Sequence, residues 1–224
     1  MLARDGNGSS RSAFSYIDTM KRRLTLAALC ALTAAAPLQA QQQAEGQNHA
    51  DYLAWLASNP GARAQVMAFK QYLDFKDIDN VLPTWQLVRT ASMWRECNGP
   101  RFEVAPFTEW QHIANTLKFI RAHVEPVIGK VEALSGYRNG ELNQCSGGAK
   151  ESAHRRFFAL DLTPVREIAR DGMIRSICRI HEWRGSSYDI GLGFYTGLRF
   201  HVDSKGFRKW GPNGKGATSP CNSV

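Results

Sequence analysis

The stretch "GGAKESAHRRFFALDLTP", residues 147–164, places a carboxylate inside an apolar segment. Its run "FFALDL" is typical of a buried strand, yet Asp161 stands in the middle of it. His154 lies seven residues earlier, in a loop that begins with two glycines. Burying a carboxylate costs free energy unless a partner compensates its charge. Asp161 therefore needs a partner, which His154 could share.

A second apolar segment, "LRFHVD" at residues 198–203, carries polar side chains in the same way. Alternate side chains of a strand point to the same face of the sheet. This alternation turns Phe200 and Val202 toward the core. It lines up three polar side chains on the other face: Arg199, His201 and Asp203. We expect two strands, each with one apolar face and one face that carries ligand-type residues.

These residue types are compatible with a metal site. On one helix, seven residues would separate His154 and Asp161 by about 10.5 Å, too far for two ligands that each lie about 2 Å from one ion. A loop that folds back over the strand brings them together, and His201 is then the candidate third ligand. Two neutral imidazoles and one carboxylate leave a zinc ion an open position, as in catalytic sites. Two structural alternatives stay open: Asp161 pairs with Arg138 or Arg199, and His201 is a hydrogen-bonded core histidine.

The N-terminal region has the pattern of a secretory signal peptide. Met20 precedes three basic residues, the apolar run "LTLAALCALTAAAPL" follows, and "LQA" ends at Ala40. We expect the chain to start at Met20 and to be cleaved after Ala40. The alternative is a membrane anchor, but the apolar run is shorter than the roughly 20 residues that a spanning helix needs. The predicted product is periplasmic and is not inserted in the membrane after cleavage.

Charge and cysteine content agree with export. The net charge of the 224 residues is +8. Residues 1–40 hold five basic and two acidic side chains, so the processed chain would carry about +5. This charge suits an anionic cell-envelope polymer, whereas export and the lack of a dense basic cluster with aromatic residues argue against a nucleic-acid partner.

Four cysteines remain after cleavage, an even number that indicates two disulfides in an exported protein. Three pairings are possible, and we favour Cys97–Cys145 with Cys178–Cys221. The alternative is a zinc site built from all four cysteines. It is disfavoured because no two of them have the C-x2-C spacing of such sites.

The order of the expected elements predicts an α+β fold. Apolar spacing predicts two helices between residues 49 and 75, a short helix opened by Pro83, and a helix over residues 107–129 with Thr108 as its N-cap. A further helix is predicted from Thr163 to Trp183. Strands are predicted at residues 130–136, 157–162, 187–195, 198–203 and 207–211. We expect a small antiparallel sheet with flanking helices and an N-terminal helical segment, in three parts: residues 1–40, 41–104 and 105–224.

Taken together, the polar segments resemble a known family. They are, in order, "SGYRNGELN" (135–143), "GGAKESAH" (147–154), "ALDL" (159–162), "GLGFY" (191–195), "FHVD" (200–203) and "RKWG" (208–211). This order is similar to that of the zinc D-alanyl-D-alanine carboxypeptidase/endopeptidase family, which shares the fold of the hedgehog signalling domain. The resemblance spans residues 105–211 and is closest to the periplasmic branch that trims peptidoglycan cross-links.

The resemblance implies a role for each matching residue. The family pattern Ser-x-His-x6-Asp falls on Ser152, His154 and Asp161, and the last zinc ligand falls on His201. The catalytic Arg138 would bind a substrate carboxylate or a developing oxyanion. Substrate binding would also involve the residues that orient the loop, Asn143 and Ser152. The candidate catalytic group beside His201 is Asp203, as general base or as its orienting partner.

Two positions depart from the family pattern. Phe157 stands where the family usually has a glycine, and its ring is expected to reshape the pocket wall. Leu198 stands where many members carry an acidic general base, and Glu182 and Asp189 are remote replacements. The predicted function is that of a zinc metallopeptidase acting on peptidoglycan stem peptides or cross-links, as a carboxypeptidase or an endopeptidase. The alternatives are a non-catalytic relative that keeps zinc and binds cell wall, and a metal-free disulfide-stapled binding protein.

Overall fold

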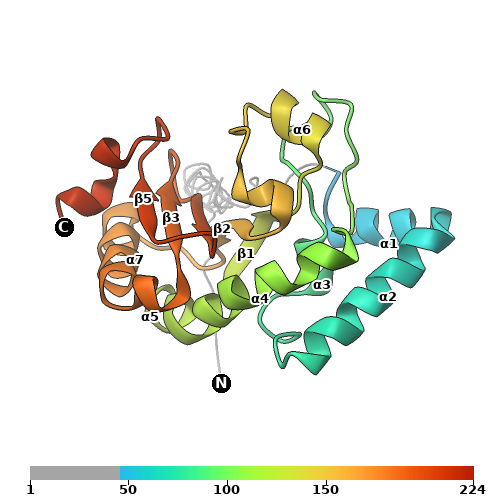
Figure 1. Ribbon diagram of the computed structural model, residues 1–224, viewed down its shortest axis with the longest axis horizontal. Coiled ribbons are helices and arrows are strands. Elements are labelled where there is room, and N and C mark those ends of the chain that lie inside the picture. The colour runs from blue at the N-terminus through green and yellow to red at the C-terminus, as the bar shows by residue number, and fades with distance from the viewer. Residues whose placement is uncertain (1–45) are drawn as a thin grey trace, which may run out of the picture. The chain divides into compact units, whose positions relative to one another are not determined.

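The computed structural model describes residues 46–224 (Figure 1). The expected signal peptide and chain start lie outside these residues. None of the helices within residues 46–224 is both long enough and apolar enough to span a membrane.

A five-stranded sheet has the strand order β1-β2-β4-β3-β5 (Figure 1). Its strands are β1 Val131–Ser135, β2 Ala159–Pro164, β3 Gly191–Phe194, β4 Phe200–Asp203 and β5 Arg208–Trp210. Neighbouring strands are antiparallel, as predicted, except for β3 and β5, which run parallel. β5 does not pair with β4, because β2 and β3 already pair with both edges of β4. After β4 the chain therefore crosses β3 and pairs β5 with the free edge of β3.

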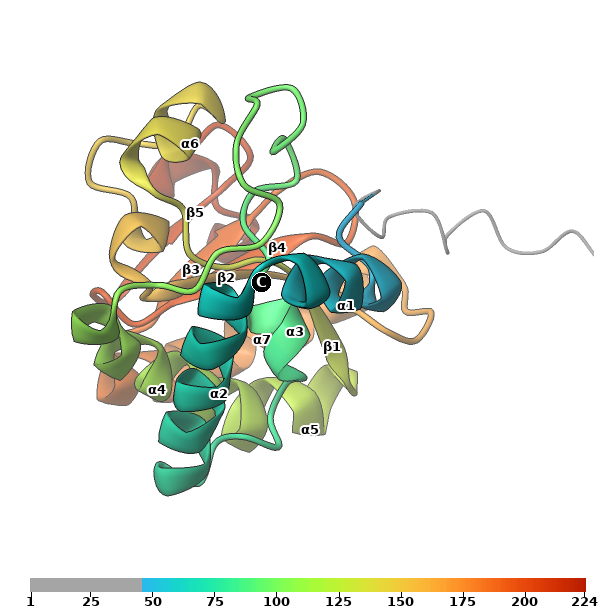
Figure 2. The ribbon, with the colours of Figure 1, turned by 90° about the vertical axis from the view of Figure 1, so that its right-hand side faces the viewer.

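Along the chain, helices come before the first strand of the sheet and between later strands. This order confirms the α+β class. The N-terminal ones are α1 His49–Ser58, α2 Pro60–Phe75 and α3 Thr84–Leu87. The next are α4 Trp110–Phe119, a π-helical segment Ile120–Val124, and α5 Glu125–Ile128. The last two are α6 Gly140–Cys145 and α7 Arg170–Arg184. Helix α4 contacts β2 and β4, and α2 packs on α4 beside the sheet (Figure 2).

Two predicted helix starts are wrong. The helix expected from Thr163 begins at Arg170, because Thr163 and Pro164 belong to β2 and pair with β1. The local Thr-Pro signal for a helix start is thus overridden by strand pairing, as tertiary context often overrides local preference. Thr108 does not cap α4 either, since a 3-10 turn at Phe107–Glu109 leads into the helix without a side-chain cap.

One hydrophobic core extends from Tyr52 in α1 to Val202 in β4. The ring of Phe69 in α2 lies 5.2 Å from that of Trp110 in α4 and 5.7 Å from that of Phe157. The predicted alternation in β4 is confirmed, because Phe200 and Val202 are fully buried in this core. The N-terminal helices therefore pack on the same core as the sheet.

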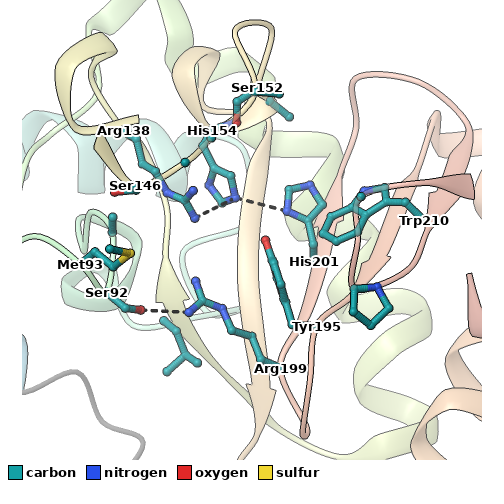
Figure 3. A pocket seen from close by; sticks show the side chains of 18 of the residues that line it. Ser92, Met93, Arg138, Ser146, Ser152, His154, Tyr195, Arg199, His201 and Trp210 are labelled. Carbon is teal, nitrogen blue, oxygen red and sulfur yellow. Dashed lines mark hydrogen bonds between the residues drawn. The ribbon is translucent and has the colours of Figure 1, made fainter. Parts of the chain in front are cut away.

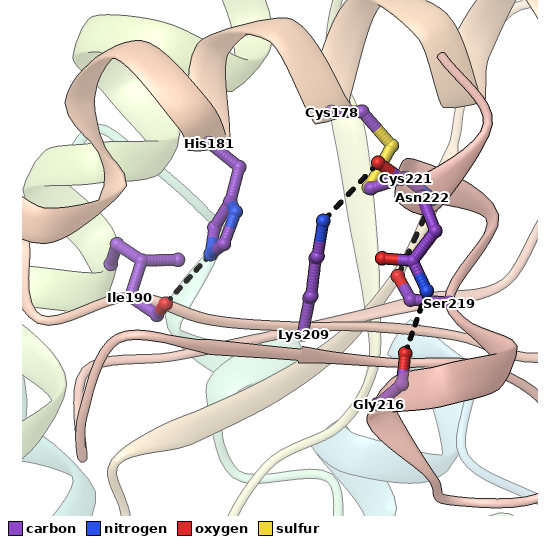
Figure 4. Close-up of a disulfide and its surroundings, with 8 residues drawn as sticks. All are labelled: Cys178, His181, Ile190, Lys209, Gly216, Ser219, Cys221 and Asn222. Atoms are coloured by element: carbon purple, nitrogen blue, oxygen red, sulfur yellow. Dashed lines mark hydrogen bonds between the residues drawn. A yellow bond between two sulfur atoms is a disulfide. The ribbon is translucent and has the colours of Figure 1, made fainter.

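Both favoured disulfides are present, Cys97–Cys145 and Cys178–Cys221. The first joins the segment that ends at Cys97 to the end of α6. The second joins α7 to the C-terminal tail, where the Lys209 ammonium also donates to the carbonyl of Cys221 at 3.2 Å (Figure 4). The polar tail is therefore fixed against α7 and β5.

Candidate metal centre

The register between β2 and β4 places Asp161 opposite His201. His154 reaches the same point from the 3-10 helix Ala153–Arg156, in the loop that precedes β2. Nε2 of His154 lies 3.2 Å from Nδ1 of His201 and 3.3 Å from Oδ1 of Asp161. Nδ1 of His201 lies 3.0 Å from the same oxygen, and all three side chains are buried. The three residues predicted as metal ligands therefore meet at one point.

The spacing of these three atoms suits zinc. Tetrahedral zinc with bonds of about 2.0–2.1 Å holds its ligand atoms about 3.3 Å apart. Two imidazole nitrogens and one carboxylate oxygen also form the donor set of catalytic zinc sites that keep one open position. No other group of three or more His, Cys, Asp or Glu side chains within residues 46–224 has a comparable arrangement. Geometry and donor chemistry thus both fit a zinc ion.

The ring nitrogens that face away from this centre each have a hydrogen-bond acceptor. Nδ1 of His154 lies 2.7 Å from the carbonyl oxygen of Gly136, and Nε2 of His201 lies 2.8 Å from Oδ2 of Asp203. Such acceptors hold the ring proton on the outer nitrogen and leave the inner lone pair for a cation. Burial, reinforced by the charge of Arg138, lowers the pKa of His154 to about 4, so its ring is neutral near pH 7.

Asp203 is buried behind His201 and is held by two further partners. The Arg208 guanidinium donates to its two oxygens at 3.0 and 2.8 Å, and the backbone N–H of Lys205 donates at 2.8 Å. Burial raises the pKa of Asp203, but His201 and Arg208 outweigh this effect and lower it to about 2. A carboxylate that is so fixed and so acidic suits the orientation of His201 better than proton exchange with a substrate.

Asp161 carries a dense set of donors on its two oxygens. Oδ2 accepts from Nη2 of Arg138 and from Nη2 of Arg199, both at 2.6 Å. Oδ1 accepts from the hydroxyl of Tyr195 at 2.9 Å. Burial raises the pKa of Asp161, but the interaction with His154 and the charges of Arg138 and Arg199 outweigh burial and hold it well below its usual range. Asp161 therefore pairs with both Arg138 and Arg199, the alternative that the sequence left open. It also belongs to the cluster that it forms with His154 and His201.

An open groove of about 1150 Å³ gives access to this centre (Figure 3). Most of its lining residues come from four segments, at positions 91–96, 146–154, 195–199 and 208–214, and Leu134, Arg138 and His201 complete the lining. The disulfide Cys97–Cys145 ties the first two of these segments together. The carboxylates that line the groove within the described residues are Glu96 and Glu151, whereas Glu182 and Asp189 are exposed elsewhere.

Arg138 faces this groove beside His154 (Figure 3). Its Nε donates to Oγ of Ser135 at 2.9 Å, and its Nη2 is engaged by Asp161. Its Nη1 has no hydrogen-bond partner within residues 46–224. A guanidinium held on one side and open on the other is suited to bind a carboxylate from the groove.

Asn143 and Ser152 hold the loop that carries His154. The Asn143 amide donates to the carbonyl of Ala149 at 3.0 Å and fills the space that a side chain at Gly148 would need. Oγ of Ser152 accepts from the backbone N–H of His154 at 3.3 Å. Ser152 lines the groove, whereas Asn143 is 2 % exposed and does not. Contact with a substrate is therefore open to Ser152 alone of this pair.

The glycines of "GLGFY" make room for two side chains of β5. Gly191 pairs with Asp203 and with Arg208, and a Cβ there would collide with both of their side chains. Gly193 pairs with His201 and with Trp210, and a Cβ there would collide with the indole ring. The missing side chains thus let Arg208 reach Asp203 and let Trp210 lie 5.3 Å from the ring of His201.

The two departures from the family pattern lie outside the groove. Phe157 is 1 % exposed, and its ring packs on Phe69 and Tyr137, so the expected change in the pocket wall is wrong. Its backbone is left-handed, with φ 54° and ψ 31°, a conformation that glycine adopts without strain. Leu198 packs against the core and does not line the groove.

Three contributors to the site were not predicted: Tyr195, Arg208 and Trp210. Tyr195 bonds Asp161, Arg208 holds Asp203, and Trp210 packs against His201. All three lie in segments that carried the family resemblance, "GLGFY" and "RKWG". The order of those segments could have pointed to these three residues as part of the site. Their contacts, however, depend on a strand register that the sequence does not reveal.

Comparisons with known proteins give one match. A model of the family described as Peptidase M15 matches residues 86–203. This range contains the three ligand-type residues, Arg138 and Asp203, and it starts before the predicted boundary at residue 105. Neither a curated protein nor a solved structure matches the chain.

Proposed function

Because the chain belongs to the Peptidase M15 family of metallopeptidases, we propose that it is a zinc-dependent enzyme that hydrolyses peptide bonds of peptidoglycan stem peptides or cross-links. In this proposal His154, Asp161 and His201 hold the zinc ion. The observation that carries it is the triangle of inner ligand atoms, 3.0–3.3 Å apart, with an acceptor behind each ring. An arrangement with both features is typical of functional metal sites.

A bound zinc ion would polarise the scissile carbonyl and lower the pKa of a water molecule. The chain's own residues supply the rest of the site. Gly136 and Asp203 keep the protons of His154 and His201 on the outer nitrogens. Arg138 offers its free Nη1 to a substrate carboxylate or a developing oxyanion in the groove. Asp203 acts through His201 as a positioning residue.

The test combines metal analysis with digestion of muropeptides. We expect near-stoichiometric zinc in the purified protein and cleavage at a bond that involves a D-amino acid, both lost in His154→Ala. His49→Ala, at an exposed histidine of α1, is the matched control and should keep both. Arg138→Gln should keep zinc and lower kcat/KM, since Arg138 is proposed to act on the substrate.

Two outcomes would support the alternatives. Zinc binding without cleavage by the wild type would indicate a non-catalytic relative that binds cell wall. A protein that takes up no zinc even after reconstitution would indicate a metal-free binding protein. The sizes of the released fragments separate a carboxypeptidase from an endopeptidase.

We also propose that the protein is exported to the periplasm. Two disulfides within the described residues support this location, because such bonds persist in oxidising compartments. Mass spectrometry of the protein isolated from the periplasmic fraction should give an N-terminus just after Ala40. A mature chain that retains residues 20–40 would contradict cleavage.

A further inference from the structure

Two arginines converge on one oxygen of Asp161. Nη2 of Arg138 and Nη2 of Arg199 each lie 2.6 Å from Oδ2, so these nitrogens are no farther apart than twice that distance. The two side chains come from separate places, the segment after β1 and the turn before β4. Both line the groove, on the same side of the histidines (Figure 3).

The charges of this cluster do not balance. One carboxylate faces two guanidinium groups, which leaves an excess positive charge before any metal ion is counted. Asp203 does not correct the excess, because Arg208 already pairs with it through two hydrogen bonds. Excess positive charge on the wall of a groove attracts anionic groups of a ligand.

Arg199 keeps donors that no neighbour uses. Its Nη2 donates to Asp161 and its Nη1 to Oγ of Ser92 at 3.1 Å. Its Nε is buried and has no partner within the described residues. The side chain is 26 % exposed, and its guanidinium lies 5.0 Å from the centre of the Tyr195 ring. A residue that served only to neutralise Asp161 would not need this open, supported position on the groove.

Building on the proposed peptidase function, we propose that Arg199 is a specificity-determining residue that binds a second substrate carboxylate beside the one bound by Arg138. The preferred substrate would then be a peptide that carries two carboxylates close together, a terminal one and one on a neighbouring residue. Arginine suits this role because its planar fork of N–H groups matches a carboxylate.

The test compares two peptides that differ only in the second carboxylate, one with the acid and one with its primary amide. The wild type should cleave the acid with a kcat/KM at least about tenfold higher, a step of the size expected for one charged hydrogen-bonded pair. In Arg199→Gln this ratio should fall toward one. Arg208→Gln removes another groove-lining positive charge and should keep the ratio. Arg199→Lys keeps the positive charge but lacks the planar pair of N–H donors, so it should restore only part of the acid-to-amide ratio.

Zinc content and circular dichroism are measured for each variant. Any general loss of activity cancels in the ratio of kcat/KM for the two peptides. Equal losses for acid and amide in Arg199→Gln would overturn the proposal, since Arg199 would then act only by positioning Asp161. Calorimetric binding of both peptides provides a second readout. If the wild type cleaves neither peptide, the proposed function fails, yet tighter binding of the acid that disappears in Arg199→Gln would still support the role of Arg199. Equal binding of both peptides by the wild type would overturn it.

Discussion

Gly193 of β3 lies under the indole ring of Trp210, and the same glycine pairs with His201 across the sheet. The glycine therefore sets how closely Trp210 can approach the candidate ligand His201. The ring of Trp210 also lies 5.2 Å from that of Tyr195, which donates to Asp161. One absent side chain thus controls the packing around two of the three proposed ligands.

We expect Gly193→Ala to displace Trp210 and to destabilise the fold by about 1–3 kcal/mol, the usual cost of an added group in a packed site. Zinc affinity and kcat/KM should fall as well, because His201 loses its packing partner. The measurements are urea denaturation and chelator competition. Gly172→Ala in α7 is the matched control, since nothing lies near its Cβ. It should be neutral or slightly stabilising, and equal effects of the two substitutions would contradict this account.

Asp203→Asn tests the orienting role of Asp203. An amide can accept from the His201 ring with its oxygen, but its NH2 group then takes the place of Oδ1 and opposes Nη1 of Arg208 and the backbone N–H of Lys205. Loss of such a supporting carboxylate typically weakens metal binding about 10–100-fold. We expect a loss of zinc affinity in this range, measured against a chelator of known affinity. Asp74→Asn, at an exposed position of α2, should leave the affinity unchanged. Full zinc affinity with abolished cleavage would instead indicate that Asp203 takes part directly in catalysis.

The sequence predicted the parts of the site that depend on period-two alternation. Phe200 and Val202 face the core, and Asp161 and His201 meet, because each strand has one apolar face. The fold-back of the His154 loop was also predictable from its glycines. The role of Arg208 was not predictable, since its contact with Asp203 depends on the crossing of β3 by the chain.

Local signals failed where a nonlocal contact outweighed them. The Thr163-Pro164 pair has the chemistry of a helix start, but the pairing of both residues with β1 keeps them in a strand. A strand over residues 157–162 would place the Phe157 side chain on the same face as Asp161. The left-handed backbone of Phe157 instead turns the ring toward Phe69 of α2, a contact that no local pattern reports.

His181 should make stability depend on pH. Burial, aided by Lys209, lowers the pKa of His181, which is hydrogen-bonded to the carbonyl of Ile190 at 2.9 Å. The unfolded chain takes up this proton near pH 6.5, while the folded chain resists it. The stabilising contribution is therefore complete above pH 6.5 and declines as the pH falls below it. The difference in unfolding free energy between wild type and His181→Gln should shrink from pH 7.5 to pH 5. A constant difference would contradict the shift.

Phe157 combines a strained backbone with a buried ring, and two substitutions separate the effects. Removal of a buried Phe side chain costs about 3–5 kcal/mol, whereas the left-handed backbone of a residue other than glycine costs about 1–2 kcal/mol. Both Phe157→Ala and Phe157→Gly should be destabilised, because packing on Phe69 and Tyr137 is lost in each. Phe157→Gly should nevertheless be the more stable of the two by about 1 kcal/mol, since only glycine relieves the strain. If residue 157 had helix or strand backbone angles, Phe157→Ala would be the more stable variant. Urea denaturation of the two variants therefore tests whether the backbone is strained. Both variants should retain zinc while folded, because the ring does not line the groove.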